Sequence, residues 1–171
     1  MSSKNKRETE FLDILERNMG FIAKAASVYA YTSQDKKDLV NDIILELWQS
    51  YPKFRGDSKV STWLYRVTLN ISLKTKRSRD NGKIVFVDEI NIFANTTIMD
   101  SEAEFIREQE LRTIYECISK LNRINKAIIL LYLEDKSNDE IADIVGISRT
   151  NVSTRLSRIR EELKIIYEQI K

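Results

Sequence analysis

The chain contains few of the residues that make tight turns. Only four glycines and one proline occur in its 171 residues, and this scarcity favours long helices over β architectures with many turns. Its apolar residues recur three and four positions apart, which is the spacing of one face of an α-helix. An apolar content of 42% is enough to build a core. We therefore expect an all-α fold, arranged as one ordinary domain or two small ones.

Three helices are expected in the first half of the chain. Their apolar stripes lie in residues 10–31, 35–50 and from Val60 onwards. The segment 51–58 contains a proline and a glycine, so we expect a loop there. We expect Trp48 to be buried, and Trp63 to pack in the core rather than to stack on a base. The core stripe of the third helix is Val60, Leu64, Val67 and Ile71.

A second group of four helices is expected after residue 103. The stripe of its first helix is Leu111, Ile114, Ile118 and Leu121, and the others span 125–133, Asn138–Val145 and Arg149–Ile170. Residues 80–103 show no sustained period and contain Asn81 followed by Gly82, so we expect a linker. The prediction is two small helical domains, with three helices in 8–79 and four in 104–171.

Charge is distributed unevenly, although the formal net charge is only +2. Residues 51–79 hold eight Lys or Arg against one Asp, a balance of +7. Residues 83–110 hold two Lys or Arg against seven Asp or Glu, a balance of −5. An acidic linker thus follows a basic segment, and this alternation indicates different partners for neighbouring parts of the chain.

Composition disfavours several classes of function. The chain has no histidine, which excludes His-based general base catalysis and the usual zinc sites. The single cysteine, Cys117, cannot form an internal disulfide and suits a reducing compartment. No apolar run approaches the roughly eighteen residues that span a bilayer, and the N-terminus lacks the apolar stretch of a signal peptide. We expect a cytoplasmic protein without a catalytic site, a metal or another cofactor.

The strongest local pattern is a helix-turn-helix in residues 137–170. Ser137 and Glu140 have the spacing of a capping box at a helix start. Gly146 supplies the left-handed residue that ends this helix, and Ser148 caps the next one. The last helix buries residues spaced by four and three, namely Val152, Leu156, Ile159, Leu163 and Ile166.

The opposite face of the last helix is rich in hydroxyl, amide and guanidinium groups. Its members are Arg149, Thr150, Asn151, Ser153, Thr154, Arg155, Ser157 and Arg158. Such groups reach base edges and phosphates when a helix lies in the major groove. The alternative is an ordinary solvated face, but such faces usually mix Glu with Lys, and no acid occurs between Arg149 and Arg160. We therefore favour DNA reading.

Two stretches together resemble the extracytoplasmic-function (ECF) sigma factors, a group of the sigma-70 family. The first stretch comprises Asp38–Trp48, Phe54–Ser58 and Ser61–Asn70, and the second is Ser137–Leu163. Their order, and their separation by an acidic linker, are also like the family. The resemblance implies a bacterial transcription initiation factor that binds core RNA polymerase and directs it to promoters.

For the first domain, the resemblance implies binding to the polymerase clamp coiled coil and melting of the minus-ten element. The clamp-facing residues would share one face of the second helix: Asp38, Asn41, Asp42, Leu45 and Glu46. Without the family, a plain solvated face would explain them equally well. The residues expected at the minus-ten element are Phe54, Arg55, Gly56, Asp57, Ser58, Tyr65, Arg66, Asn70, Lys74 and Arg77. Aromatic and basic groups suit a melted strand because bases stack and phosphates need cations.

For the second domain, the resemblance implies reading of the minus-thirty-five element and binding to the polymerase flap. The residues expected at this element are Arg149, Asn151, Ser153, Thr154, Arg155, Ser157 and Arg158. Ser153, Thr154 and Ser157 match the family's base-reading positions, while Arg155 and Arg158 would hold phosphates. An anti-sigma factor is a further expected partner. The promoter sequence and the inducing signal do not follow from the sequence.

The chain departs from the family pattern at two places. Asn41 stands where glutamine is common, and residues 121–126 lack a proline that the family often has, so that helix start can differ. The main alternative function is a stand-alone helix-turn-helix regulator that acts without joining the polymerase. Such a regulator would not explain the positive charge of residues 51–79. The sequence strongly disfavours a nucleic-acid enzyme, because it has no histidine and no clustered set of carboxylates.

Overall fold

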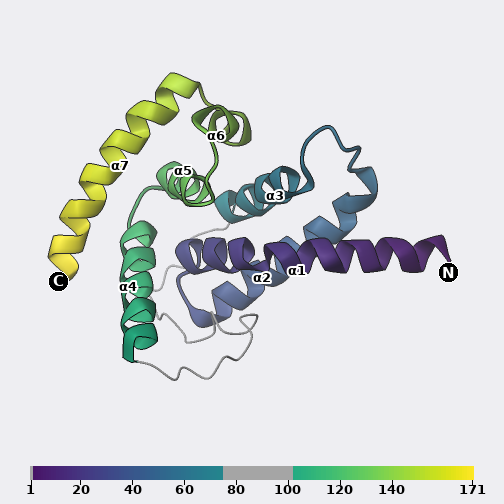
Figure 1. Ribbon diagram of the computed structural model, residues 1–171, viewed down its shortest axis with the longest axis horizontal. Helices are drawn as coiled ribbons and strands as arrows, with labels where there is room; N and C mark the ends of the chain where they lie inside the picture. Colours follow the sequence, from purple (N-terminus) through teal and green to yellow (C-terminus); the bar gives the residue numbers. More distant parts are fainter. Residues whose placement is uncertain (1, 75–101) are drawn as a thin grey trace.

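Helices follow one another in two groups in the computed structural model, which describes residues 2–74 and 102–171 (Figure 1). The first group is α1 (Ser3–Tyr29), α2 (Ser33–Ser50), the 3-10 turn η1 (Tyr51–Lys53) and α3 (Val60–Lys74). The second group is α4 (Glu102–Ser119), α5 (Arg123–Leu133), α6 (Asn138–Val145) and α7 (Arg149–Ile170). The described residues form no strand, so the expected all-α fold of three helices and then four is confirmed.

The helix boundaries follow from side-chain caps. Thr32 starts α2 by accepting a hydrogen bond from the Asp35 amide at 3.0 Å, and Asn122 starts α5 by accepting one from the Asn125 amide at 2.9 Å. Polar oxygens at these positions satisfy amides that the helix itself leaves unpaired. Asn122 therefore does without the proline that the family often has in this segment. Most of the expected linker lies outside the described residues, but its last two positions, Glu102 and Ala103, already belong to α4.

The core of the first group lies where α1, α2 and α3 meet. Ile22, Ile43, Leu47 and Leu64 are fully buried there. The expected burial of Trp48 is wrong, since this side chain is 40% exposed. Trp48 lies near the end of α2, where Phe11 of α1 covers one edge of its ring at a centroid distance of 5.0 Å.

The second group buries only part of α4. Cys117, Ile118 and Leu121 are buried, whereas Leu111 and Ile114 are 52% and 44% exposed. The expected stripe is therefore correct only for its second half. In the first turns of α4, Phe105 and Ile106 are also exposed, so this part of the helix projects beyond its neighbours.

The two groups share one continuous core. The buried apolar residues form a single cluster that runs from Phe11 to Ile166, because α4 and α5 pack on α1, and α5 and α6 pack on α3. Figure 1 shows α3 between α1 and the pair α5 and α6. Because α3 packs on α5 and α6 as well as on α1, more than one side of it is buried. Leu64 of the expected stripe is fully buried, and Val67 and Ile71 are half-buried against the core. Tyr65, Thr68, Leu69 and Ser72, which the stripe did not include, are buried as well.

No helix among the described residues combines the length and the apolar content needed to cross a bilayer.

Candidate nucleic-acid interface

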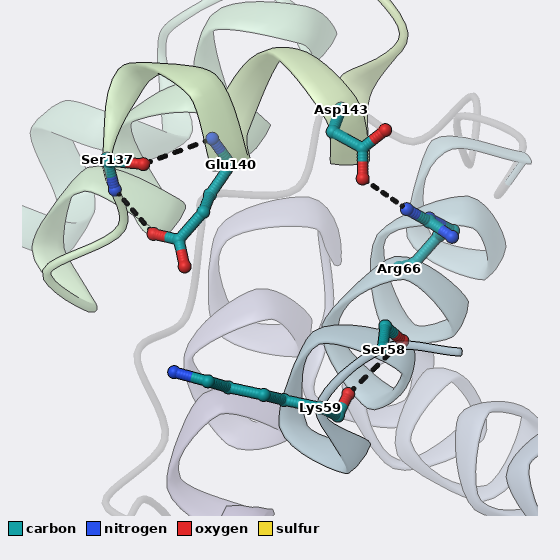
Figure 2. A network of polar contacts seen from close by, with 6 residues as sticks. All are labelled: Ser58, Lys59, Arg66, Ser137, Glu140 and Asp143. Atoms are coloured by element: carbon teal, nitrogen blue, oxygen red, sulfur yellow. Dashed lines mark hydrogen bonds and ion pairs between the residues drawn. The ribbon is translucent and has the colours of Figure 1, made fainter. Parts of the chain in front are cut away.

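The helix-turn-helix is built by local hydrogen bonds around residues 137–148. The Ser137 hydroxyl accepts from the Glu140 amide at 3.2 Å, and the Ser137 amide donates to the Glu140 carboxylate at 2.7 Å (Figure 2). Gly146 ends α6 with a φ of 80°, a left-handed conformation that only glycine adopts without strain. Ser148 then caps α7 by accepting from the Asn151 amide at 3.1 Å. The capping box and both caps are thus confirmed.

The capping carboxylate is also the centre of a charged cluster. The pKa of Glu140 is lowered, first by the hydrogen bond from the Ser137 backbone and then by the Ser137 hydroxyl. The positive charges of Lys136 and Lys59 lower it further. Lys59 precedes α3 in the other domain, and Figure 2 shows its side chain extending below the capping box. The two domains therefore interact electrostatically at this point.

The last helix, α7, buries one face and exposes the other. Val152, Leu156, Ile159 and Ile166 are buried as expected, while Leu163 is half-buried. The side chains exposed on the opposite face are Arg149, Thr150, Asn151, Ser153, Thr154, Ser157 and Arg158. A helix with this polar face can enter a major groove without losing its own packing.

Arg155 differs from the other residues of this face because it is half-buried. Its Nε donates to the side-chain oxygen of Asn151, and a terminal nitrogen donates to that of Asn125, both at 3.0 Å. Asn125 is buried at the start of α5 and was not among the sequence-predicted residues. The available signal was an amide at the start of a helix whose later residues are mostly apolar, since buried polar groups need partners.

The acidic face of α2 is open to solvent. All five sequence-predicted residues are exposed: Asp38, Asn41, Asp42, Leu45 and Glu46. Leu39, Ile43 and Leu47 on the opposite side are buried. Trp48 lies seven residues after Asn41, two helical turns away, so it adds an exposed aromatic ring to the same side. Sequence reasoning missed this contribution because it assigned Trp48 to the core.

The loop before α3 presents the next set of predicted residues. Arg55, Gly56 and Asp57 are exposed, and Phe54 and Ser58 are half-buried. The ring of Phe54 lies 5.2 Å from that of Trp63, which is itself half-buried. This agrees with the preference for packing at Trp63. Asn70 and Lys74 are exposed on α3, and Arg77 lies outside the described residues.

Tyr65 does not offer an open stacking surface, contrary to expectation. Only 9% of this residue is exposed. Its ring packs on Phe21 at 4.1 Å, and its hydroxyl donates to Glu134 of the second domain at 3.5 Å. Burial raises the pKa of the Tyr65 hydroxyl, and the charge and hydrogen bond of Glu134 raise it further. Phe21 and Glu134, which are both distant from Tyr65 in the sequence, therefore cover its side chain.

Arg66, the adjacent predicted residue, is also engaged. A terminal nitrogen lies 3.1 Å from a carboxylate oxygen of Asp143 on α6 (Figure 2). The structure thus separates the sequence-predicted DNA residues into two sets. The set on α7 is largely open, whereas Tyr65 and Arg66 on α3 face the second domain.

Comparison with known proteins identifies the family. Residues 14–82 match the family model described as Sigma-70 region 2, and residues 111–163 match that of Sigma-70, region 4. The ECF RNA polymerase sigma-E factor of Haemophilus influenzae is 30% identical over 138 residues, covering 76% of this chain and 73% of that protein. The chain belongs to the ECF sigma factors. It is a transcription initiation factor, and the stand-alone regulator is not favoured.

Another relative and two solved structures are also similar to this chain. The RNA polymerase sigma factor YlaC of Bacillus subtilis is 28% identical over 129 residues, which are 75% of each chain. The fold resembles that of CnrH in complex with the cytosolic domain of CnrY, with a TM-score of 0.67 at 21% identity, over 96% of this chain and 91% of that one. It also resembles the sigma factor RpoE in complex with the anti-sigma factor NepR from Bartonella quintana, with a TM-score of 0.59 at 17% identity, over 94% and 96% of the chains.

In this ECF sigma factor, the region 2 match contains the acidic face of α2, the loop 54–58 and α3. The region 4 match contains the helix-turn-helix. Each predicted set of site residues therefore lies within a matched region.

Proposed function

We propose that this sigma factor binds core RNA polymerase in the cytoplasm and directs it to promoters without catalysing a reaction itself. The domain bounds that we assign are 8–79 for the polymerase-binding and minus-ten domain, 80–103 for the acidic linker and 104–171 for the minus-thirty-five domain. The observation that carries the proposal is the presence, in one chain, of an exposed acidic face on α2 and an acid-free recognition face on α7.

The exposed face of α2 is the proposed clamp-binding surface. Asp38, Asp42 and Glu46 supply negative charge, which complements a basic coiled coil and speeds correct encounter. Leu45 and Trp48 add exposed apolar area, and buried aromatic and aliphatic anchors supply most of the affinity of such interfaces. We therefore add Trp48 to the five residues predicted from the sequence.

The exposed face of α7 is the proposed reader of the minus-thirty-five element. Ser153, Thr154 and Ser157 present short polar groups to base edges, and Arg158 is free of the contacts that hold Arg155. We assign Arg158 to a phosphate. Arg155 would contact DNA in a geometry fixed by Asn125, because a tethered guanidinium loses less side-chain entropy on binding.

The loop 54–58 and α3 form the proposed surface for the melted minus-ten strand. Extruding a base costs a few kcal/mol, so a pocket with polar groups must receive it. The exposed loop residues and Asn70 provide such groups, while Lys74 and Arg66 provide positive charge along α3. The RpoE structure of similar fold is a complex with the anti-sigma factor NepR, and we propose an anti-sigma factor and the polymerase flap as further partners of this chain.

A transcription assay with purified core polymerase tests the proposal. Genomic fragments serve as template, and transcripts that start only when the protein is present reveal its promoters. Reversing charge at the clamp-binding surface, Asp42→Arg with Glu46→Arg, should abolish co-purification with core polymerase and these transcripts, while circular dichroism stays unchanged because both sites are exposed.

The matched control is Glu161→Arg with Glu168→Arg, which changes the charge equally on exposed positions of α7. It should still co-purify. Equal polymerase binding by both variants would remove α2 from the interface. Tight duplex binding by the protein alone, with no polymerase-dependent starts, would instead favour a stand-alone regulator.

A further inference from the structure

The first turn of α6 contacts the exposed face of α7 through two side chains. The side-chain amide nitrogen of Asn138 donates a hydrogen bond to the hydroxyl oxygen of Ser153 at 3.0 Å. One residue later, a carboxylate oxygen of Asp139 lies 3.5 Å from a guanidinium nitrogen of Arg149. Ser153 and Arg149 were predicted from the sequence as DNA contacts, whereas Asn138 was not. Two of the predicted side chains are therefore held by residues of the preceding helix.

The position of Asn138 is fixed by the helix-turn-helix itself. Asn138 is the first residue of α6 and follows Ser137 directly, so the capping box defines its backbone. The two helices pack on each other, and Ile141 of α6 and Val152 of α7 are both fully buried. Asn138 itself is half-buried. Its amide is therefore held beside Ser153 by the packing of the two helices.

The bond from Asn138 decides which groups of the Ser153 hydroxyl remain for DNA. A serine hydroxyl has one O–H donor and two acceptor lone pairs, and Asn138 occupies one of these lone pairs. In helices the O–H often donates to the carbonyl four residues earlier, as the hydroxyls of Ser27 and Ser72 both do at 2.8 Å. Among the described residues, no acceptor takes the Ser153 proton. The proton of Ser153 is therefore available to a ligand.

Donors and acceptors distinguish the bases in the major groove. Guanine presents only acceptors there, N7 and O6, and cytosine presents only the N4 amino donor. A hydroxyl that offers its proton can bond to guanine, and one that offers a lone pair can bond to cytosine. A serine hydroxyl without a protein partner rotates and serves either base. A neighbour that always donates to the hydroxyl favours the first arrangement.

We propose that Asn138 is a positioning residue that sets the base preference of Ser153. By donating to the hydroxyl oxygen, Asn138 directs the Ser153 proton towards a major-groove acceptor, such as N7 or O6 of guanine. Asn138 acts through Ser153 and does not itself contact a base. This inference rests on the proposed reading of the minus-thirty-five element by α7, and it makes α6 part of the determinant of promoter specificity.

Replacing Asn138 with an acid tests the inference, because a carboxylate only accepts hydrogen bonds. In Asn138→Asp the Ser153 proton turns towards the new carboxylate, and the lone pairs of the hydroxyl then face the base. The preference should shift from guanine towards cytosine. The helix should persist, since acids are favourable in the first turn of a helix, and circular dichroism checks this. If the variant unfolds, Asn138→Ala replaces it and should weaken the preference without reversing it.

The measurement uses the chain bound to core polymerase and a promoter found in the transcription assay described above. Each base pair of the minus-thirty-five element is changed in turn, and competition binding gives relative affinities. The position that Ser153 reads is the one at which Ser153→Ala removes the preference. At that position, Asn138→Asp should lower the ratio of guanine to cytosine affinity by about tenfold, from one hydrogen bond lost and one gained. The added negative charge weakens binding to all sequences alike and cancels in the ratio.

The matched control repeats Asn138→Asp in the Ser153→Ala background, where no hydroxyl is present. The ratio should then stay unchanged. A shift that persists without the hydroxyl would mean that residue 138 contacts the base directly, and would overturn the positioning role.

The remaining results distinguish this inference from the proposed function. If Ser153→Ala removes the preference at one base pair but Asn138→Asp leaves the ratio there unchanged, the role of Asn138 is overturned and reading by α7 stands. If Ser153→Ala alters no base preference, reading by Ser153 is overturned, and the role of Asn138 with it. A shift that occurs only when the Ser153 hydroxyl is present supports both.

Discussion

The recognition face of α7 and the basic face of α3 are both proposed to bind promoter DNA, but they differ in solvent exposure. On α7 all but one of the predicted side chains are exposed, and Arg155 is tethered within its own domain. On α3, Tyr65 is buried and Arg66 is paired, each against the other domain. A duplex is present before the polymerase arrives, whereas a melted strand appears only later. The two DNA surfaces therefore differ in the isolated chain, one open and the other in contact with the neighbouring domain.

The largest effect, on the free energy of unfolding, is expected from a substitution in the core beneath the exposed face of α7. Ile159 is fully buried beneath this face, and Ile159→Ala should lower the free energy of unfolding by about 2–5 kcal/mol. Ile165→Ala on the same helix is the control, since Ile165 is exposed and its loss should cost no more than about 0.5 kcal/mol. Urea unfolding followed by circular dichroism measures both. Equal costs would mean that Ile159 does not anchor α7.

The same experiment addresses the shared core. Because one buried cluster includes residues of both domains, we expect a single cooperative transition in the wild-type chain. If the region 2 domain kept its helicity while the region 4 domain of Ile159→Ala unfolded, the shared part of the core would contribute little to stability.

A smaller effect should distinguish the open face from the covered one. Arg158→Ala removes a charge-assisted phosphate contact worth about 1.5 kcal/mol, roughly tenfold in Kd. It should also lower the slope of log affinity against log salt by about one. Because the α7 face is open, the loss should be similar on duplex promoter variants of different sequence. Fluorescence anisotropy over a salt series measures it.

Arg66→Ala provides the contrast. Its effect on single-stranded binding should be larger when Asp143→Asn removes the paired carboxylate, since Arg66 pairs with Asp143 at 3.1 Å. A change of base preference by Arg158→Ala, instead of uniform weakening, would mean that Arg158 reads bases.

The sequence predicts a feature well when the residues that determine it are close together in the chain, and poorly when they are far apart. The bounds of α6 and α7 were predicted correctly because Ser137, Gly146 and Ser148 act within a few residues of themselves. The burial of Tyr65 was not predicted, because it depends on Glu134 and Lys136, which lie about seventy residues away in the sequence. The apolar periodicity of α3 cannot indicate contacts with residues so far away in the sequence.

The error at Trp48 has a different cause. Apolar spacing predicts the side of a helix that packs, but not how far along its length the packing partner extends. Trp48 lies on the margin of that side, in the last turn of α2, where Phe11 packs against its edge and 40% of the residue stays exposed. For the same reason Leu111 and Ile114 fit the stripe of α4 and still remain exposed.

The smallest effect is expected for the Arg66–Asp143 pair taken alone. The Asp143 side chain is 77% exposed and that of Arg66 is 40% exposed, so water and salt screen their attraction, and exposed pairs typically contribute about 0.2–1 kcal/mol. A double-mutant cycle with Arg66→Ala and Asp143→Ala, read by urea unfolding, should give a coupling within this range that falls as salt is added. The pair of Lys24 with Glu134, whose carboxylate is only 21% exposed, should couple more strongly and resist salt better. If the Arg66 pair gave the larger coupling, the contact between the two domains would depend mainly on this one pair. A smaller coupling would mean that the contact between the domains is distributed over the Glu134 cluster and the buried Tyr29 hydrogen bond.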